Sequence, residues 1–508
     1  MGGSKEYRQK LKYQVSCAEN KTLENQIRGE LRGNLGLSEI ESELLSKILV
    51  EYVSQDVEIR NPNQIIIKGA ETKESFARGY LTKKGKRIKV TPFHIDDLEV
   101  EIEFGISAMQ LNRIIRLIEE SEKQDSLISS KQISYILNIT PTSLRGRLQK
   151  LRSMGLCVPT RGLSAKEREK KGMYCSTWLL KRYFSKKDTI KARKEVGMSD
   201  TKFKEILAEF ATVVKKGQLR NDEEKKQWIE VAKEIPKKDI KRFVSKYPDY
   251  EEKPNDIQSL KKVLTQDFNF SPIKTRAVVE LVEEIKEKLK NQRKDNQVIY
   301  WAVAAGEPAG KALKECKLIG VTIDYINDEE MGETENNRDL NRLREIKFER
   351  ILRYTIQAKK SGGYLTYADL SYLMGINVES LRRMVKSNPK IVIPLRGSEC
   401  DIGRGIAHKK EIISLYMQMY TETEIVNKTG HSYEAIEDYI KEFATVWMLT
   451  KKGMPPAMIR KITKRSKKLI DSYIELINRY AAPEYAFRYH HLEQIFYRNQ
   501  GDKKKGSL

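Results

Sequence analysis

The chain is poor in cysteine and contains no long apolar run. Its five cysteines lie far apart among 508 residues, with no C-x-x-C pair: Cys17, Cys157, Cys175, Cys316 and Cys400. This usage is typical of a reduced intracellular protein and argues against a secreted disulfide framework. No window of 18 apolar residues occurs and the first residues are polar and basic, so we expect a soluble cytoplasmic protein with no signal peptide.

Histidine and phosphate-loop patterns are equally sparse. The five histidines form no H-E-x-x-H or H-x-H pattern, so neither a zinc site nor a nucleophile triad is indicated. The segment 305–311 has the spacing G-x-x-x-G-K, one residue short of a phosphate-binding loop, and a hairpin turn is the simpler interpretation. We therefore expect no metal and no cofactor.

Positive charge is what the chain has in excess. Lys and Arg number 95 against 71 Asp and Glu, which gives a formal net charge of +24. Such a balance favours polyanionic partners but does not specify a fold. The length suggests about three domains at roughly 100–200 residues each.

The sequence contains one long unit twice. The string EFATV begins at Glu209 and recurs at Glu442, and Asn63-Gln64-Ile65-Ile66 matches Asn296-Gln297-Val298-Ile299 at the same offset of 233. ISYILNITPTSLRGR, from Ile133, matches LSYLMGINVESLRRM, from Leu370, at an offset of 237. The order of these matches predicts a diverged tandem duplication.

The matches set the expected organisation. Residues 22–247 form copy one and residues 255–480 form copy two, joined by a polar linker at 248–254 and flanked by tails at 1–21 and 481–508. Within copy one we expect a helical/β part, a helix-turn-helix part and two further tri-helical modules, at 22–109, 110–162 and 163–247. The corresponding parts of copy two are 255–340, 341–397 and 398–480.

Periodicity predicts a mostly α fold with small β elements. Each copy opens with an amphipathic helix pair, for which Ser38 and Ser271 are plausible N-caps. Short β-branched runs follow, at Gln64–Lys68 with Lys86–Thr91 and at Val298–Ala304 with Lys317–Ile323. The fold class is thus a tandem duplication of a ~230-residue unit, each with two or three helix-turn-helix-like tri-helical modules.

The first helix-turn-helix part carries the candidate DNA-binding residues. In copy two, a helix at Tyr367–Met374, a turn at Gly375–Asn377 and a helix from Val378 are expected. Arginine on such a helix suits guanine, and Ser or Thr suits phosphates. The outward residues are Thr142, Ser143, Arg145, Arg147, Lys150, Glu379, Ser380, Arg382, Arg383 and Lys386, and Arg161, Arg396 and Arg404 are further DNA-binding candidates. The alternative is a tri-helical core with a solvated basic face.

Two later modules contribute further candidates. One begins a helix with His431, Ser432 and Tyr433, although its Glu434, Glu437 and Asp438 would repel a phosphate backbone and favour a packing role. The other has a basic cluster around a turn, made of Arg460, Lys464, Arg465, Lys467 and Lys468. This cluster suits phosphate contacts, with a solvated charged face as the alternative.

Copy two also carries the strings GEPAGKALKEC, IPLRG, DIGRGIAHKKEII and HSYEAIEDYIKEF. From about Leu264 to Tyr480 it resembles the prokaryotic family known as domain of unknown function 1670. Copy one keeps VPTRG and EFATV but lacks counterparts of EPAGK, GRG-x-x-HK and HSYEAI, so its resemblance is partial. The resemblance implies a helix-turn-helix protein of bacteria and archaea, often carried by mobile elements, with no established reaction.

The function expected from these features is sequence-specific binding of double-stranded DNA, as a nucleoid-associated regulator or site-specific binder. A fused pair of copies would act as an internal pseudo-dimer with a high effective concentration, which leaves further self-association open. A metal-dependent enzyme that cuts or rejoins DNA is an alternative, since acidic sets occur at Asp96–Glu103 and Asp328–Glu335. RNA is a third partner class, although only 8% of residues are aromatic. No membrane partner is expected.

Overall fold

The computed structural model describes residues 12–13, 15–56, 59–71, 85–160, 172–216, 222–247, 254–290, 293–307, 313–327, 329–331, 340–388, 391–399, 405–429 and 433–505. The chain divides into two compact units, each described by itself below. Unit 1 comprises Met1–Tyr300, Thr322–Lys347 and Ser371–Asn377, and unit 2 comprises Trp301–Val321, Phe348–Leu370 and Val378–Leu508. Unit 1 therefore contains copy one together with residues 255–300, 322–347 and 371–377 of copy two.

Unit 1 contains the two amphipathic helix pairs that open the copies. In copy one they are α2 (Leu23–Leu35) and α3 (Glu39–Ser54), and in copy two α14 (Ile257–Gln266) and α15 (Pro272–Lys290). Ser38 caps α3 in a capping box with Glu41, and the Ser271 hydroxyl accepts a hydrogen bond from the Lys274 amide at the start of α15. Both N-cap predictions are confirmed.

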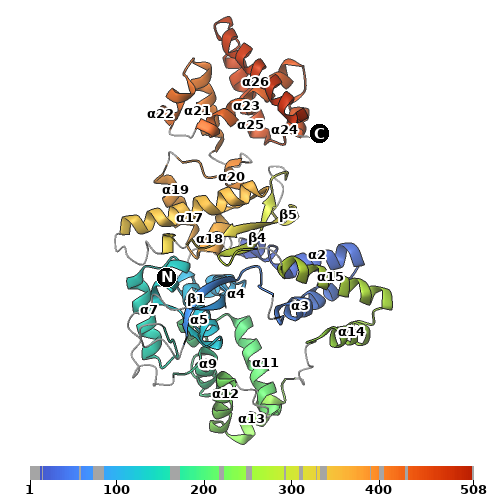
Figure 1. Ribbon diagram of the computed structural model, residues 1–508, viewed down its shortest axis with the longest axis vertical. Coiled ribbons are helices and arrows are strands. Elements are labelled where there is room, and N and C mark those ends of the chain that lie inside the picture. The colour runs from blue at the N-terminus through green and yellow to red at the C-terminus, as the bar shows by residue number, and fades with distance from the viewer. Residues whose placement is uncertain are drawn as a thin grey trace. The chain divides into compact units, whose positions relative to one another are not determined.

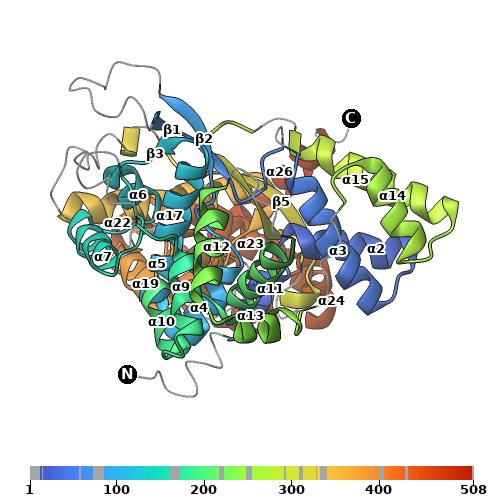
Figure 2. The ribbon, with the colours of Figure 1, turned by 90° about the horizontal axis from the view of Figure 1, so that it is seen from below.

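The two helix pairs lie side by side and share one core (Figures 1 and 2). Burial of their apolar stripes against each other is what stabilises these helices, since short isolated helices are marginal in water. The core residues come in pairs separated by 233 positions: Ile27 and Leu260, Leu31 and Leu264, Leu37 and Phe270, Leu45 and Val278, Leu49 and Val282. The two copies thus pack through equivalent surfaces.

A small antiparallel sheet follows in copy one. Its strands are β1 (Ile65–Glu71), β2 (Lys86–Val90) and β3 (Ser126–Leu127), in the order β2-β1-β3. Ile65 pairs with Val90, and Ala70 pairs with Leu127. The helices α4 (Asp96–Phe104) and α5 (Ile106–Lys123) come next, and α5 packs on β2 and β3.

The loops before β1 and before the equivalent strand of copy two exchange reciprocal hydrogen bonds. The Ile66 amide donates to the Asp295 carbonyl over 2.8 Å, and the Ile299 amide donates to the Pro62 carbonyl over 2.8 Å. Ile66 and Ile299 are equivalent, as are Pro62 and Asp295, at the offset of 233. The same bond therefore occurs once in each direction, as at a two-fold axis between identical subunits.

Two equivalent arginines repeat this exchange. Arg60 donates to the carbonyl groups of Arg293, Lys294 and Asp295, over 3.1, 2.8 and 3.0 Å. Arg293 in turn donates to the carbonyl groups of Arg60, Asn61 and Pro62. Burial, and then the nearby Arg60 charge, lower the pKa of Arg293 to about 9. Each copy thus uses an equivalent arginine to donate hydrogen bonds to the loop carbonyl groups of the other copy.

The rest of copy one in unit 1 is helical. After α6 and α7, described below, come α9 (Cys175–Phe184), α10 (Thr189–Val196), α11 (Asp200–Lys216), α12 (Glu223–Glu234) and α13 (Lys237–Val244). Phe184, Phe210 and Phe243 form an aromatic cluster, with ring centroids 5.0 to 5.9 Å apart. This cluster joins α9, α11 and α13 into one helical layer.

In copy two the equivalent sheet has the order β5-β4-β6. The strands are β4 (Gln297–Ala304), β5 (Leu318–Asp324) and β6 (Gly363–Tyr364), and the short η2 (Leu313–Glu315) precedes β5. Gly363 pairs with Ala304 and allows no side chain, because a Cβ there would lie 2.9 Å from the Ala302 Cβ. The helix α17 (Leu340–Lys360) leads into β6.

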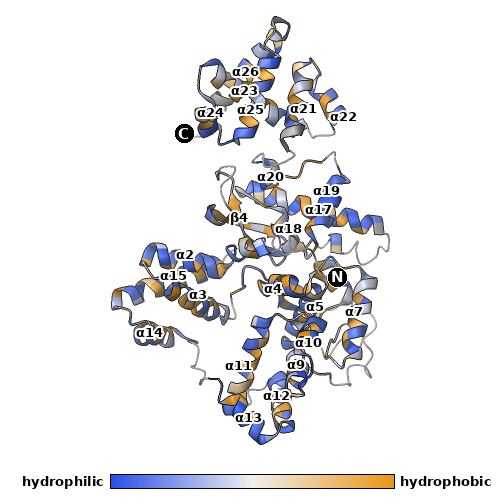
Figure 3. Cartoon of the chain, turned by 180° about the vertical axis from the view of Figure 1, so that it is seen from behind, coloured by the Kyte–Doolittle hydropathy of each residue, from blue (hydrophilic) through white to orange (hydrophobic). Residues whose placement is uncertain are grey.

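The C-terminal part of unit 2 is a helical module. It consists of α21 (Gly405–Met417), α22 (Glu422–Thr429), α23 (Tyr433–Lys451), α24 (Pro456–Thr463), α25 (Lys467–Arg479), η3 (Pro483–Tyr485) and α26 (Ala486–Lys505). Hydrophobic and hydrophilic residues alternate along these helices (Figure 3). The buried residues, among them Phe443, Ile459 and Tyr473, form one core.

The expected C-terminal tail belongs to this module. Leu492 of α26 is buried in its core, and the Tyr489 ring stacks on Trp447 of α23 with centroids 5.0 Å apart. This tyrosine-rich segment has no match in copy one, and α26 packs against α23 of copy two. Among the described residues, no helix has both the length and the apolar character needed to cross a membrane.

Candidate nucleic-acid interface

In copy one, the segment predicted to be a helix-turn-helix consists of α6 (Ser130–Ile136) and α7 (Pro141–Ser153). Ser129 and Gln132 form a capping box at the start of α6, and Asn138 adopts a φ of 56° in the turn. Thr140 caps α7 through the Ser143 amide, and Pro141 occupies the first helical position, where its missing N–H costs nothing.

One face of α7 is buried and the other is open to solvent. Leu144, Leu148 and Leu151 anchor the helix. The expected DNA-binding residues Thr142, Ser143, Arg145 and Lys150 are exposed, and so is Gln149, which sequence reasoning missed. No residue of α7 is acidic, while Arg145, Arg147, Lys150 and Arg152 are basic. The exposed face therefore combines cations with hydrogen-bonding groups.

Arg147 lies less openly than expected. It is half-buried, its Nη2 lies 3.5 Å from the Ser107 hydroxyl, and burial lowers the pKa of its guanidinium. Gly146 beside it is exposed in the middle of the helix, where glycine is about 1 kcal/mol less favourable than alanine. Among the described residues, nothing would approach a Cβ at Gly146 within 4 Å.

The equivalent segment of copy two has the helices α18 (Tyr367–Met374), with the bounds that the sequence predicted, and α19 (Val378–Lys386), which begins at the predicted residue. Its turn contains Gly375, whose φ of 64° is the left-handed conformation that glycine adopts freely. Asp369 accepts hydrogen bonds from the Thr366 amide and hydroxyl at the start of α18. Glycine at 375 and asparagine at 138 are equivalent turn residues.

The exposed face of α19 differs from that of α7. Glu379, Arg382, Arg383 and Lys386 are exposed, and Ser380 is half-buried. Arg382 lies 3.7 Å from the Glu379 carboxylate, and its guanidinium lies 5.7 Å from the centroid of the Tyr367 ring. Leu381 anchors the helix. The face is basic, but it includes an ion pair that α7 lacks.

The turn between α6 and α7 and the turn between α18 and α19 lie in unit 1, and each accepts hydrogen bonds from the other copy. Gln110 donates to the Gly375 carbonyl over 3.0 Å, and Lys347 donates to the Asn138 carbonyl over 2.8 Å. These two bonds are again reciprocal, because both pairs of equivalent residues are 237 positions apart. Asn138 also donates to the Met374 carbonyl over 3.0 Å. The turn that leads into each candidate recognition helix is thus fixed by the other copy.

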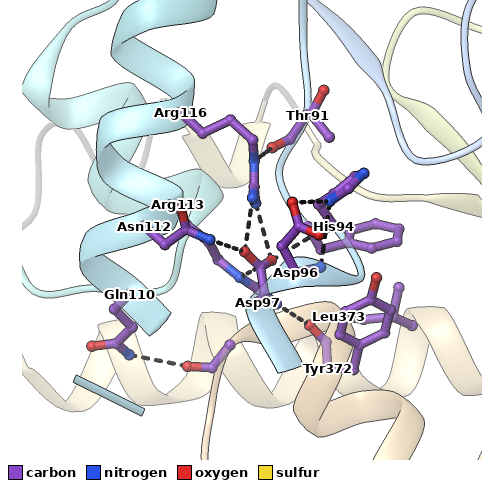
Figure 4. Close-up of polar contacts among 12 residues, drawn as sticks. Thr91, His94, Asp96, Asp97, Gln110, Asn112, Arg113, Arg116, Tyr372 and Leu373 are labelled. Carbon is purple, nitrogen blue, oxygen red and sulfur yellow. Dashed lines mark hydrogen bonds and ion pairs between the residues drawn. The ribbon is translucent and has the colours of Figure 1, made fainter. Parts of the chain in front are cut away.

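A buried charge cluster underlies these turns (Figure 4). The Asp97 carboxylate is fully buried and lies 2.8 Å from Arg116 and 2.8 Å from Arg113. Arg113 also donates to the Tyr372 carbonyl of copy two over 2.7 Å. Burial alone would raise the pKa of Asp97, but Arg116 and Arg113 outweigh it and hold that pKa below its usual value. The cluster therefore links the two copies through a charged aspartate.

The equivalent place in copy two repeats the arrangement in part. Glu330, 233 positions after Asp97, accepts a hydrogen bond from the Tyr135 hydroxyl over 2.8 Å. Tyr135 and Tyr372 are equivalent residues at the offset of 237. Burial, followed by the Asp97 charge, raises the pKa of Tyr372 above its usual value. A buried acid of each copy, Asp97 or Glu330, thus interacts with the equivalent tyrosine of the other copy, Tyr372 or Tyr135.

The basic cluster of the C-terminal module surrounds the turn between α24 and α25. Arg460, Lys464, Lys467 and Lys468 are exposed, and Lys464 adopts a φ of 55°. Arg465 is half-buried and serves another purpose, because it lies 3.3 Å from the carboxylate of the half-buried Glu442, which also binds Lys409 over 3.0 Å. Four of the five expected residues therefore remain available to an anionic partner.

Of the remaining DNA-binding candidates, one is buried, one is exposed and four lie outside the described residues. Arg396 is buried, with 4% of its surface exposed, and its Nη2 lies 3.2 Å from the Cys316 sulfur. This burial leaves Arg396 little surface for the expected DNA contact; it begins the short helix α20 (Arg396–Glu399) in unit 2. Tyr433 is exposed at the start of α23. Arg161, Arg404, His431 and Ser432 lie outside the described residues.

Two acidic residues of the first candidate catalytic set, Asp97 and Glu101, are buried, and part of the second set lies outside the described residues. Asp97 binds arginines, and burial raises the pKa of Glu101 to about 7, with the Asp97 charge adding to the effect. Asp328 and residues 332–339 lie outside the described part of the chain. Over the residues that the structure describes, no group of three His, Cys, Asp or Glu side chains has the arrangement to hold a metal ion.

The sequence matches one family model twice, over residues 37–245 and 264–476. The family is described as "Protein of unknown function (DUF1670)". Because the two matches cover most of the chain, this protein belongs to that family and contains two tandem copies of its domain. The match to residues 37–245 extends the family to copy one, where sequence motifs gave only a partial resemblance. No curated protein and no solved structure gives a significant match.

Proposed function

We propose that this protein binds double-stranded DNA through the segments α6–α7 and α18–α19. The observation that carries the proposal is the exposed face of α7. Thr142, Arg145, Gln149 and Lys150 project from a helix with no acidic residue. Arginine binds guanine in two hydrogen bonds, glutamine binds adenine, and Lys or Thr contacts phosphates, so this face suits a major groove.

The overall charge supports the same partner. A net charge of +24 favours release of counterions from a nucleic-acid backbone, which supplies affinity independent of sequence. The exposed Arg460, Lys464, Lys467 and Lys468 add a second basic surface in unit 2. We infer a site-specific binder or regulator, and the differences between α7 and α19 favour a target whose two parts are not identical.

The test is selection from a random duplex library at about 0.15 M salt, with and without magnesium, followed by sequencing and a gel assay for cleavage. The expected result is an enriched, intact duplex motif. Nicked products would favour an enzyme that cuts or rejoins DNA. A lack of enrichment, or preferential competition by folded RNA, would contradict the proposal.

The variant test removes two charges from α7. Arg145→Ala with Lys150→Ala is expected to weaken binding to the selected duplex roughly 30-fold, since a specific base contact is worth about 1–3 kcal/mol. The matched control removes two exposed lysines elsewhere, Lys233→Ala with Lys288→Ala, whose partners are Glu230 and Glu284. Equal losses in both double variants would mean that only total charge matters.

A further inference from the structure

Gly146 occupies an unusual position on α7. It lies in the interior of a 13-residue helix, is exposed, and has no neighbour among the described residues within 4 Å of where a Cβ would be. Glycine weakens a helix interior, because the unfolded chain loses more freedom and no side chain packs. Neither backbone conformation nor internal crowding requires glycine at this place, so the reason lies outside the described fold.

The neighbours of Gly146 suggest that reason. On a helix surface, positions three and four residues apart are adjacent, so Thr142, Gln149 and Lys150 surround Gly146, with Arg145 beside it. All four side chains are exposed. A partner that contacts these hydrogen-bonding groups together would meet bare helix backbone at their centre.

Copy two provides an internal comparison. At the offset of 237, Gly146 corresponds to Arg383, Thr142 to Glu379 and Gln149 to Lys386. Arg383 is exposed in the middle of α19, and the nearby Glu379 pairs with Arg382 over 3.7 Å. A long cation at the central position keeps a partner away from the backbone of α19. A partner can therefore come closer to the backbone of α7 than to the backbone of α19.

We propose that Gly146 is the closest-approach position for DNA: a base edge or thymine methyl group in the major groove contacts the backbone of α7 there. Thr142, Arg145 and Gln149 then reach the neighbouring bases. The helix α19 contacts mainly phosphates through Arg382, Arg383 and Lys386. This inference rests on the proposed DNA binding and assigns the discrimination between sequences to copy one.

The test compares Gly146→Arg, which introduces the copy-two residue, with Gly29→Arg. Gly29 is the matched control, because it is also exposed in a helix interior, in α2, with nothing within 4 Å of a Cβ. On the duplex selected by the wild-type protein, Gly146→Arg is expected to lose at least about 30-fold in affinity despite its added positive charge. Gly29→Arg is expected to bind as tightly as the wild-type protein or slightly more tightly, since binding strengthens with positive charge.

A second variant separates binding from folding. Gly146→Ala is expected to raise the melting temperature by about 1–2 °C, through better helix propensity, and to weaken specific binding roughly five-fold. Wild-type affinity in both Gly146 variants would overturn the close approach and leave DNA binding standing. Equal losses in Gly146→Arg and Gly29→Arg would also overturn it. Failure of the wild-type chain to enrich any duplex would remove the proposed function, and this inference with it.

Discussion

The two copies still contact each other through equivalent residues. Their solvent-facing surfaces, by contrast, have diverged. Arg60 and Arg293 make the same bonds in both directions, and the core of α2, α3, α14 and α15 is formed by equivalent apolar residues. On α7 and α19, by contrast, Thr142 is replaced by Glu379 and Gly146 by Arg383. The contact between the copies is thus retained within one chain, while the faces expected to meet a partner have become distinct.

The largest expected effect comes from breaking the buried charge cluster between the copies. Asp97→Asn removes the buried carboxylate that Arg113 and Arg116 share, and the loss of one partner of a buried ion pair costs about 3–5 kcal/mol. Urea unfolding of the variant and the wild type measures this difference. Asp125→Asn, the same change at an exposed carboxylate, is the control and is expected to cost under about 0.5 kcal/mol. A similar small cost for Asp97→Asn would mean that the cluster contributes little.

A pair of equivalent substitutions tests whether the shared helical core is symmetric in energy. Leu31→Ala and Leu264→Ala remove fully buried side chains and are each expected to cost about 2–5 kcal/mol, with similar values. Thermal or urea unfolding gives the two free energies, and Leu44→Ala, at a half-exposed position of α3, is the control. If only one of these two substitutions lowers the free energy of unfolding, the equivalent residues pack alike but do not contribute equally to stability.

A smaller effect tests a half-buried acid, Glu119, that copy two lacks. Burial, and then the Glu224 charge, raise the pKa of Glu119 to about 8, whereas the equivalent residue in copy two is Ile356. The unfolded carboxyl ionises near 4.5, so the wild-type protein loses stability as the pH rises from about 4.5 to about 8. Glu119→Gln removes this loss. Its gain over the wild type is expected to be about 1 kcal/mol or more at pH 8 and close to zero at pH 5.

Melting temperatures across this pH range measure the gain. The control is Glu230→Gln, at an exposed glutamate paired with Lys233, which is expected to show no gain that increases with pH. A Glu119→Gln variant that gains equally at pH 5 and pH 8 would contradict a raised pKa and would indicate a packing effect instead.

Local features were predictable where short-range chemistry determines them. The bounds of α18 and α19 follow from apolar periodicity and from Gly375, and the capping of α3 follows from Ser38 and Glu41. The duplication was also visible, because its matched residues keep their order. These signals require only neighbouring residues or the comparison of two segments.

Features that depend on distant segments were not predictable in the same way. Nothing local distinguishes Arg396, which is buried beside Cys316, from a surface arginine in a loop. Arg113 and Asp97 likewise look like members of ordinary charged helices until α4 and α5 pack together. The offsets of 233 and 237 mark Arg60 and Arg293, and Asn138 and Gly375, as equivalent residues, but only the folded chain shows that the equivalent segments meet.

The reciprocal bonds have a consequence for how such a protein can change. In a homodimer, one substitution alters both sides of the interface at once, so a useful asymmetry cannot arise by a single mutation. Here each side is encoded separately: Gln110 and Lys347 already perform equivalent roles with different chemistry, each donating to the turn of the other copy. Covalent fusion therefore lets one half specialise while its twin preserves the shared scaffold.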